Sequence, residues 1–161
     1  MSIYQTLDTP DGPFTVVVSD GAVLASGWTA QLDELVPLVH SGIRPTDVSA
    51  GDAGAAAEAV RAYYGGELGA PDAVPVRQRS GEFLEHAWEV LRGIPAGAPV
   101  TYSEYAAKAG RPAAIRAAAS ACARNAAALF VPCHRVLRLD GSLGGFRWGL
   151  DVKRSLLARE A

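Results

Sequence analysis

The first half of the chain alternates short apolar runs with turn residues, a pattern typical of a small β-sheet. Residues 3–7, 14–18 and 23–28 are rich in β-branched and aromatic side chains. Asp11-Gly12 and Asp20-Gly21 lie between these runs and are favourable hairpin turns. The pattern predicts three strands joined by hairpins in a small antiparallel sheet.

Helical patterns follow these strands. Residues 55–64 form the stronger one, which ends at Gly65-Gly66. Residues 31–40 form a weaker pattern that Pro37 interrupts. Residues 72–76, with prolines nearby, are expected to be an edge strand or a linker. We place a domain boundary near Arg77, so that residues 1–77 form an N-terminal α/β structural domain.

The second half of the chain is predicted to be mainly helical. Ser80 is expected to cap a helix that runs to residue 92, with Phe83 and Leu91 on its apolar face and Gly93 at its end. A last helix is expected over residues 150–159, with Glu160 at its end. Residues 78–161 therefore form the predicted C-terminal domain.

Two short helices in this half form a candidate helix-turn-helix. Thr101 and Glu104 match a capping box, and the helix they open is expected to stop near Gly110. Pro112 suits the first turn of a second helix that runs to about Arg124. The pattern alone is not specific for DNA, because many helical hairpins bind nothing.

The second of these helices consists almost entirely of small residues around one cation, Arg116. Alanine is a good helix former, so close packing against neighbouring helices explains the pattern. A smooth surface that approaches a groove, with Arg116 projecting from it, explains the pattern equally well.

Charge is distributed unevenly along the chain, whose net charge is −2. Residues 1–77 carry three Arg and ten Asp or Glu, a net charge of −7, whereas residues 78–161 carry a net charge of +5. A basic half suits a polyanionic partner such as nucleic acid. Chance clustering of charges on solvated faces is the alternative.

Cysteine and histidine usage limits the chemistry and the compartment. Two cysteines and three scattered histidines show no metal-ligand spacing, so we expect no metal site. We expect no cofactor either. No apolar stretch is long enough to span a bilayer, and no signal peptide is visible. We expect a bacterial, cytoplasmic protein with reduced thiols and no membrane partner.

The segment Pro132-Cys133-His134-Arg135 carries the candidate chemistry. It follows an apolar run, and its thiol stands next to an imidazole. Thiolate is the reactive form of cysteine, and a neighbouring base helps to generate it. The alternative is an inert, packed cysteine, which is the usual state of a buried thiol.

Several motifs of the second half occur in the order of a known family. They are Tyr102, Ala114-Ile115-Arg116-Ala117, Asn125, the segment from Val131 to Val136, the loop Gly144-Gly145-Phe146-Arg147-Trp148-Gly149, Lys153 and Glu160. In these motifs the chain resembles the O6-alkylguanine-DNA alkyltransferases, also called methylated-DNA–protein-cysteine methyltransferases. The resemblance covers about residues 80–161, whereas the first half matches only in length and hairpin pattern.

The resemblance implies a role for each residue of the candidate site. Cys133 would accept the alkyl group, and His134 would act as a base through a water molecule. Glu160 would orient His134, as a carboxylate does in a catalytic triad. Asn125 would hold the turn that carries the cysteine, and Tyr102 would hydrogen-bond the guanine ring.

The resemblance also implies that the mainly α C-terminal domain contains a winged-helix-like helix-turn-helix, with a DNA-binding face and a substrate pocket. Arg116 would fill the space of a base extruded from the duplex, as reaction at a stacked base requires. The other DNA-binding positions would be Thr101, Tyr102, Ala117, Ala118, Ala119 and Arg124, and the pocket would be lined by Tyr102, Val136, Phe146, Arg147 and Trp148. Four positions differ from the usual family pattern: Ala119 stands in place of glycine, Ala126 in place of proline and Phe146 in place of tyrosine, and Trp148, which occurs in some bacterial members, would narrow the pocket.

The implied activity is irreversible, single-turnover transfer of a methyl or other alkyl group from duplex DNA to Cys133. O6-alkylguanine is the expected substrate, O4-alkylthymine is a further candidate, and a monomer is expected. Three alternatives remain: a non-catalytic protein that binds alkylated DNA, a Cys-His hydrolase and a plain helix-turn-helix regulator. The first would lack Cys133, the second leaves the helix of Arg116 unexplained, and the third needs neither Cys133 nor Glu160.

Overall fold

The computed structural model describes residues 1–161, and its internal contacts divide the chain into two compact units. Unit 1 comprises Met1–Arg79 together with Ala126–Phe130, and unit 2 comprises Ser80–Asn125 together with Val131–Ala161. The segment Ala126–Phe130 therefore belongs with the first unit, so the two units are not separated by one boundary near Arg77 alone.

Unit 1 is built on a four-stranded sheet. Its strands are β1 (Ser2–Thr9), β2 (Gly12–Ser19), β3 (Ala22–Gly27) and β4 (Val48–Ala50), in the spatial order β3-β2-β1-β4. The two predicted hairpins are present as antiparallel pairs. β4 pairs with β1 in the parallel direction, so the sheet is mixed and the prediction of a purely antiparallel sheet is wrong. Hairpin pairing is encoded locally, whereas this short, mostly exposed strand is placed by contacts distant in sequence.

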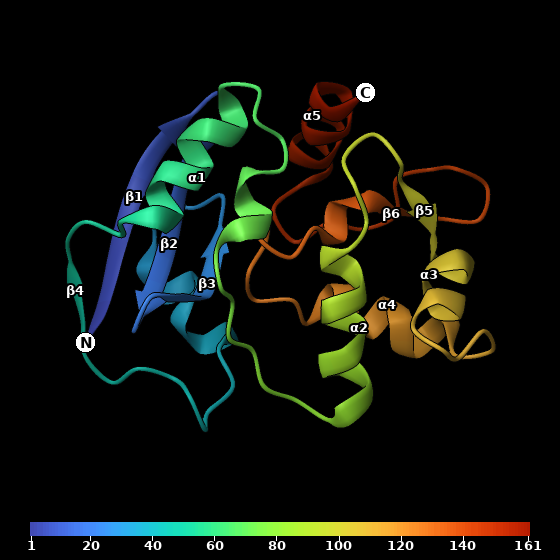
Figure 1. Ribbon diagram of the computed structural model, residues 1–161, viewed down its shortest axis with the longest axis horizontal. Coiled ribbons are helices and arrows are strands. Elements are labelled where there is room, and N and C mark those ends of the chain that lie inside the picture. Colours follow the sequence, from blue (N-terminus) through green and yellow to red (C-terminus); the bar gives the residue numbers. More distant parts are fainter. The chain divides into compact units, whose positions relative to one another are not determined.

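Helix α1 (Ala55–Tyr64) covers the sheet of unit 1, alongside β1 and β2 (Figure 1). It has the predicted limits, and it buries Ala56, Val60 and Tyr63. The expected helix over residues 31–40 is replaced by two 3-10 turns, η1 (Leu32–Glu34) and η2 (Val36–Leu38). Pro37 lies in η2, where its missing N–H prevents a continuous helix.

The segment that precedes the second unit is irregular. A 3-10 turn, η3 (Ala70–Ala73), leads to an isolated parallel bridge between Val23 and Val76. A second isolated bridge joins Ser26 to Ala127, which attaches the returning segment to the same strand, β3.

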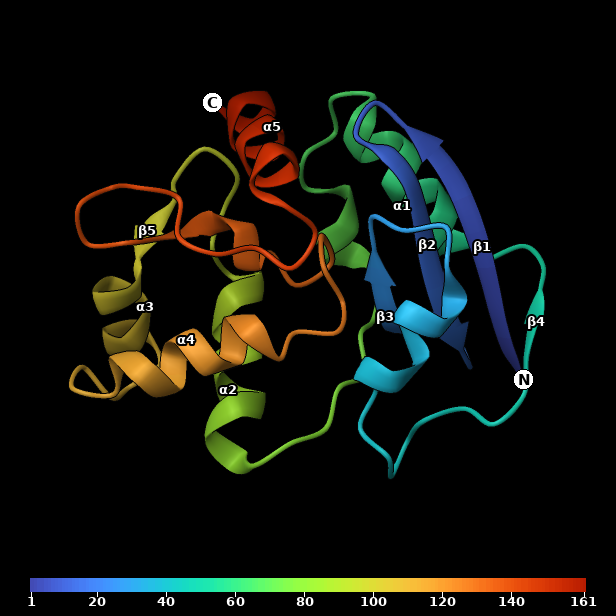
Figure 2. The same cartoon turned by 180° about the vertical axis from the view of Figure 1, so that it is seen from behind.

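Unit 2 contains four α-helices and a short parallel strand pair. The helices are α2 (Glu82–Arg92), α3 (Tyr102–Lys108), α4 (Ile115–Ala123) and α5 (Leu150–Glu160). The strands β5 (Val100–Thr101) and β6 (Val136–Leu137) pair with each other, and the 3-10 turn η4 (Cys133–Arg135) leads directly into β6. Figure 2 shows α2, α3 and α4 gathered on one side of this strand pair.

Two buried hydrogen bonds hold these three helices together. The indole N–H of Trp88 on α2 donates to the carbonyl of Ala121 on α4 over 2.8 Å. The hydroxyl of Tyr105 on α3 donates to the carbonyl of Ala87 on α2 over 2.7 Å. Buried polar tips need such partners, so each aromatic ring also fixes the position of one helix against another.

The start of α3 follows the prediction. Thr101 accepts a hydrogen bond from the backbone of Glu104, and the Glu104 carboxylate accepts one from the backbone of Thr101. This reciprocal arrangement is the predicted capping box.

Two other helix starts differ from the prediction. The N-cap of α2 is Gly81 rather than Ser80, and no side chain caps this helix. α4 begins at Ile115 rather than at Pro112 because α3 ends in a Schellman motif: Arg111 N–H donates to Ala106 and Gly110 N–H to Ala107. Gly110 takes a φ of +90° there, and the next residues form a turn before α4 can begin.

None of the helices is both long enough and apolar enough to cross a lipid bilayer.

Candidate active site

The turn η4 carries the candidate nucleophile, and all three of its residues are buried. The backbone N–H of Cys133 donates to the carbonyl of Val131 over 2.8 Å. The side-chain amide of Asn125 donates to the same carbonyl over 2.7 Å. Asn125 thus lies where the sequence predicts a residue that holds this turn.

Behind the turn, the carboxylate of Glu160 binds two neighbouring side chains. Its Oε2 lies 2.8 Å from Nε2 of His134. The guanidinium of Arg135 binds both carboxylate oxygens, with Nε to Oε1 at 2.9 Å and Nη2 to Oε2 at 3.1 Å. The side chains of His134, Arg135 and Glu160 are only 0%, 3% and 1% exposed, so this is a buried cluster rather than a solvated helix end.

Arg135 is a site residue to which the sequence analysis assigned no role. Its third hydrogen bond, from Nη1 to the carbonyl of Ile94, is 2.7 Å long and connects the cluster to the segment that follows α2. A buried carboxylate needs a charged or hydrogen-bonding partner. The sequence signal that could have indicated this role is the position of an arginine directly after His134.

The Glu160 contact determines which nitrogen of His134 carries the proton. A carboxylate only accepts hydrogen bonds, so Nε2 of His134 is the donor, and Nδ1 of a neutral ring keeps its lone pair. Nδ1 is buried and has no protein hydrogen-bond partner. Burial lowers the pKa of His134, while the hydrogen bond and charge of Glu160 oppose this shift. The ring is therefore neutral at pH 7 and able to accept a proton through Nδ1.

Burial also raises the pKa of the Cys133 thiol. A hydrogen bond from Asn125 and the charges of Lys153 and Arg147 act in the opposite direction and moderate the increase. The resting thiol is protonated near neutral pH, so a nucleophilic reaction of Cys133 needs a base to remove its proton.

Tyr102, the first residue of α3, faces the loop of residues 143–149, called the glycine loop below. A Cβ atom placed on Gly144 would lie 3.5 Å from both the ring and the hydroxyl oxygen of Tyr102. Burial, and then the negative charges of Cys122 and Cys133 when ionised, raise the pKa of Tyr102 to about 12. Its phenol therefore remains protonated and can act as a hydrogen-bond donor.

The remaining positions predicted to line a substrate pocket lie on β6 and in the loop between β6 and α5. Val136 is fully buried on β6. Phe146 and Trp148 are half-buried in the loop. Arg147 is exposed and donates from Nη2 to the carbonyl of Ala123 over 2.7 Å, which ties the loop to the last turn of α4.

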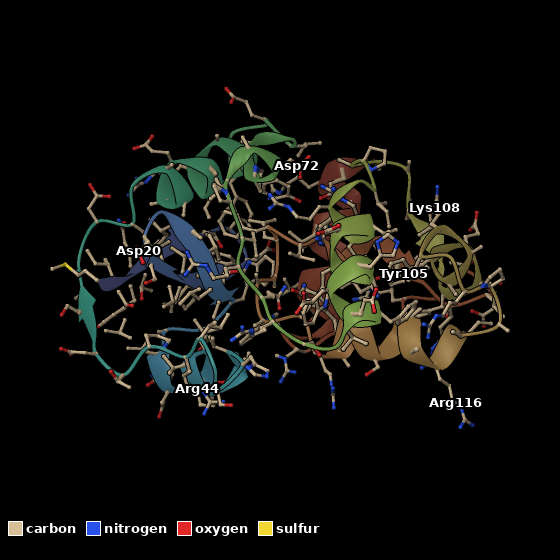
Figure 3. All side chains as sticks on the ribbon, turned by 60° about the horizontal axis from the view of Figure 1, so that its bottom comes forward. Asp20, Arg44, Asp72, Tyr105, Lys108 and Arg116 are labelled. Carbon is tan, nitrogen blue, oxygen red and sulfur yellow. The ribbon has the colours of Figure 1, made fainter.

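Not all of the predicted DNA-binding positions on and next to α4 are exposed. Arg116 and Arg124 are exposed, and Figure 3 shows the Arg116 side chain extending away from the ribbon. Ala117 and Ala119 are half-buried, whereas Ala118 has no exposed surface. We correct the prediction for Ala118: it faces the interior of unit 2, because helical periodicity turns every third or fourth residue towards α2 and α3.

Comparison with known proteins places this geometry in context. Residues 82–161 match the family model described as "6-O-methylguanine DNA methyltransferase, DNA binding domain". A methylated-DNA–protein-cysteine methyltransferase of Mycobacterium bovis is 34% identical over 157 residues, which cover 98% of this chain and 91% of the relative. The crystal structure of the Mycobacterium tuberculosis O6-methylguanine methyltransferase has a TM-score of 0.81 and 31% identity, covering 99% of this chain and 93% of the other.

Some relatives match over a smaller part of their length. The Escherichia coli protein Ada, a bifunctional transcriptional activator and DNA repair enzyme, is 48% identical over 91 residues, but the match spans 56% of this chain and only 26% of Ada. The full-length similarity to the mycobacterial relatives and the matched DNA-binding domain nevertheless agree. The chain belongs to the 6-O-methylguanine DNA methyltransferase family.

Proposed function

We propose that this protein repairs alkylated DNA by transferring an alkyl group from O6 of guanine to its own Cys133, once per molecule. The observation that carries the proposal is the buried series Cys133, His134 and Glu160. A protonated thiol precedes a neutral imidazole whose other nitrogen is held by a carboxylate. The names of the full-length relatives support the same activity.

The transfer begins with removal of the thiol proton. His134 accepts this proton at Nδ1, through a water molecule, and the adjacent Glu160 stabilises the resulting imidazolium. The sulfur then attacks the alkyl carbon in line, so that the S–C bond forms as the C–O6 bond breaks. The proton lost by the thiol balances the proton that the released guanine gains.

Tyr102 assists departure of the guanine. Negative charge develops on the purine ring as the C–O6 bond breaks, and a protonated phenol next to the ring stabilises that charge through a hydrogen bond. The raised pKa of Tyr102 keeps the phenol in the donor form.

DNA reaches this site through α3 and α4, which we propose form the helix-turn-helix of a winged-helix-like domain. The target carbon lies inside the duplex, so the base has to rotate out of the stack before the sulfur can attack it. Arg116 projects from α4 and would occupy the space that the base leaves. Arg124, Thr101, Ala117 and Ala119 complete the proposed DNA-binding face. A crystal structure of the M. tuberculosis relative with DNA supports DNA as the partner.

The product is a thioether, which unlike a disulfide or a thioester is not cleaved by thiols or water, so each molecule reacts once. A non-catalytic lesion-binding protein has no need for the cysteine and the buried cluster behind it. A hydrolase would need a cleavable acyl intermediate and an oxyanion hole.

The cellular setting is a further part of the proposal. Both cysteines are free thiols, which suits a reducing cytoplasm. Every proposed catalytic residue lies in unit 2 of one chain, which suits a monomer. O4-alkylthymine remains a candidate second substrate.

Intact-mass measurement after incubation with duplex DNA that contains O6-methylguanine tests the function. We expect the protein to gain the mass of one methyl group, mapped to Cys133. Cys133→Ala should prevent the transfer while DNA binding persists, whereas Cys122→Ala should react like the wild type. Transfer by the Cys133→Ala protein, or an unchanged mass of the wild type, would contradict the proposal.

A further inference from the structure

One face of α5 carries two buried, oppositely charged residues towards the site. Lys153, Leu156 and Glu160 are the buried residues of this helix, at spacings that place them on one face. Glu160 accepts a hydrogen bond from His134, as described above. Lys153 has no part in the proposed chemistry, although it is completely buried.

The ammonium group of Lys153 is satisfied by backbone carbonyls alone. It donates to Val136 on β6 over 2.8 Å, to Leu143, and to Gly145 over 3.5 Å. A lysine ammonium has three N–H donors, and these carbonyls account for all of them. The three acceptors belong to two segments: the strand β6, which follows η4, and the glycine loop.

This arrangement fastens the glycine loop on both sides of Gly144. Leu143 and Gly145 are held by the ammonium, and Gly144 between them faces the ring of Tyr102. Gly144 has a φ of +71°, a backbone conformation that other residues rarely adopt. The lysine therefore connects β6 to the part of the loop that faces Tyr102.

The charge of Lys153 is not matched by a carboxylate. Desolvation lowers its pKa and the charge of Arg138 acts in the same direction, whereas Cys133 and Cys122 act against this shift only when they are ionised. A buried cation without an acidic partner is costly, and strongly perturbed groups concentrate at functional sites. The thiolate formed at Cys133 during the reaction would supply the missing negative charge.

We propose that Lys153 is a positioning residue for alkyl transfer: its ammonium group holds the glycine loop near Tyr102 and places a positive charge at Val136, directly after the turn that carries the reacting sulfur. The inference rests on the proposed function, since it concerns the same thiol. The other groups acting on that thiol are Asn125, which donates a hydrogen bond, and Arg147, which is exposed and therefore screened by solvent. The charge of Lys153 also disfavours protonation of His134, whereas the hydrogen bond between His134 and Glu160 favours it.

The first test measures the reactivity of Cys133 with methyl iodide as a function of pH, in a Cys122→Ala background. Methyl iodide requires neither DNA nor guanine, so this test remains valid if the proposed repair function is wrong. Lys153→Met removes the charge and the donors at similar length, and we expect a reaction about tenfold slower at pH 7, equivalent to an increase of about one unit in the apparent thiol pKa. Lys153→Arg keeps the charge and should keep most of the reactivity.

Lys108→Met is the matched control, because Lys108 is exposed and is the only other lysine of the chain. Its methyl iodide profile should coincide with that of the wild type. Amide hydrogen exchange should also become faster at residues 143–145 in Lys153→Met and remain unchanged in Lys108→Met. Wild-type reactivity and wild-type exchange in a folded Lys153→Met protein would overturn the proposal.

A second test uses the native residue and does not depend on the stability of a variant. Lysine labelled with 15N at Nζ yields two side-chain signals, one from Lys153 and one from the internal control Lys108. Methylation of Cys133 by methyl iodide removes the possibility of a thiolate, so the pKa of Lys153 should decrease while that of Lys108 stays constant. An unchanged Lys153 titration after methylation would show that the charge does not act on the sulfur.

Discussion

Glu160 is one residue from the end of the sequence, yet its substitution should affect both folding and chemistry. Glu160→Ala removes the partner of His134 and the bidentate partner of Arg135, both of which are buried. Removing one member of a buried ion pair costs about 3–5 kcal/mol, because the other charge is left without compensation. For a domain with a total stability of about 5–15 kcal/mol, this is a large fraction.

Thermal or urea unfolding measures the first effect. We expect the melting temperature of Glu160→Ala to decrease by roughly 10 °C, since each kcal/mol corresponds to about 2–4 °C in a chain of this size. Asp151→Ala is the matched control: Asp151 is an exposed acid on the same helix, and its side chain pairs with Arg154 at the surface over 3.0 Å. An exposed pair of this kind contributes about 0–1 kcal/mol.

The rate of methyl transfer against pH measures the second effect at a temperature at which the variant is folded. Without the carboxylate, the imidazolium of His134 loses its stabilising charge, so the proton of Cys133 is removed less easily and the apparent thiol pKa increases. DNA affinity should change little. If Glu160→Ala matched Asp151→Ala in both stability and pH profile, the buried cluster would have no energetic or catalytic role, and the reasoning would be refuted.

Three further predictions concern other parts of unit 2. Arg116→Ala should slow repair of duplex DNA at least tenfold but leave the reaction with free O6-benzylguanine unchanged, because the free base needs no extrusion; equal losses in the two rate measurements would contradict this. Thr101→Ala should lower the stability by about 1 kcal/mol in urea unfolding, because it removes half of the capping box. Burial lowers the pKa of His134, so the unfolded chain binds more protons at this residue than the folded one; stability should therefore fall as the pH falls below about 6.5, the ordinary histidine value. His134→Gln should weaken this dependence in unfolding measured at pH 7 and pH 5, whereas substitution of the exposed His86 should not.

Salt dependence offers a separate test of the proposed DNA-binding face. Binding through exposed cations such as Arg116 and Arg124 should weaken steeply as salt increases and should show little preference for sequence. A footprint that is insensitive to salt and specific for sequence, measured on several duplexes, would favour the regulator alternative.

Local sequence patterns determined the elements whose hydrogen bonds close within a few residues. The hairpins of β1 to β3, the helix α1 with its glycine stop, and the capping box of Thr101 and Glu104 all follow from side chains close to one another in the chain. The order of motifs around Cys133 likewise indicated the family before any contact was known. Each of these features depends on turn chemistry, periodicity or residue type at a fixed spacing.

Tertiary structure decided the features that depend on distant partners. The parallel pairing of β4 arises from contacts outside its own segment. The delayed start of α4 follows from the way α3 ends, and the burial of Ala118 follows from packing against neighbouring helices. The bidentate contact of Arg135 with Glu160, 25 positions apart, has no local signature in either segment. The same holds for Lys153, whose exposure and partners depend on where β6 and the glycine loop lie, because burial of a charge is a property of the folded surroundings rather than of the residue.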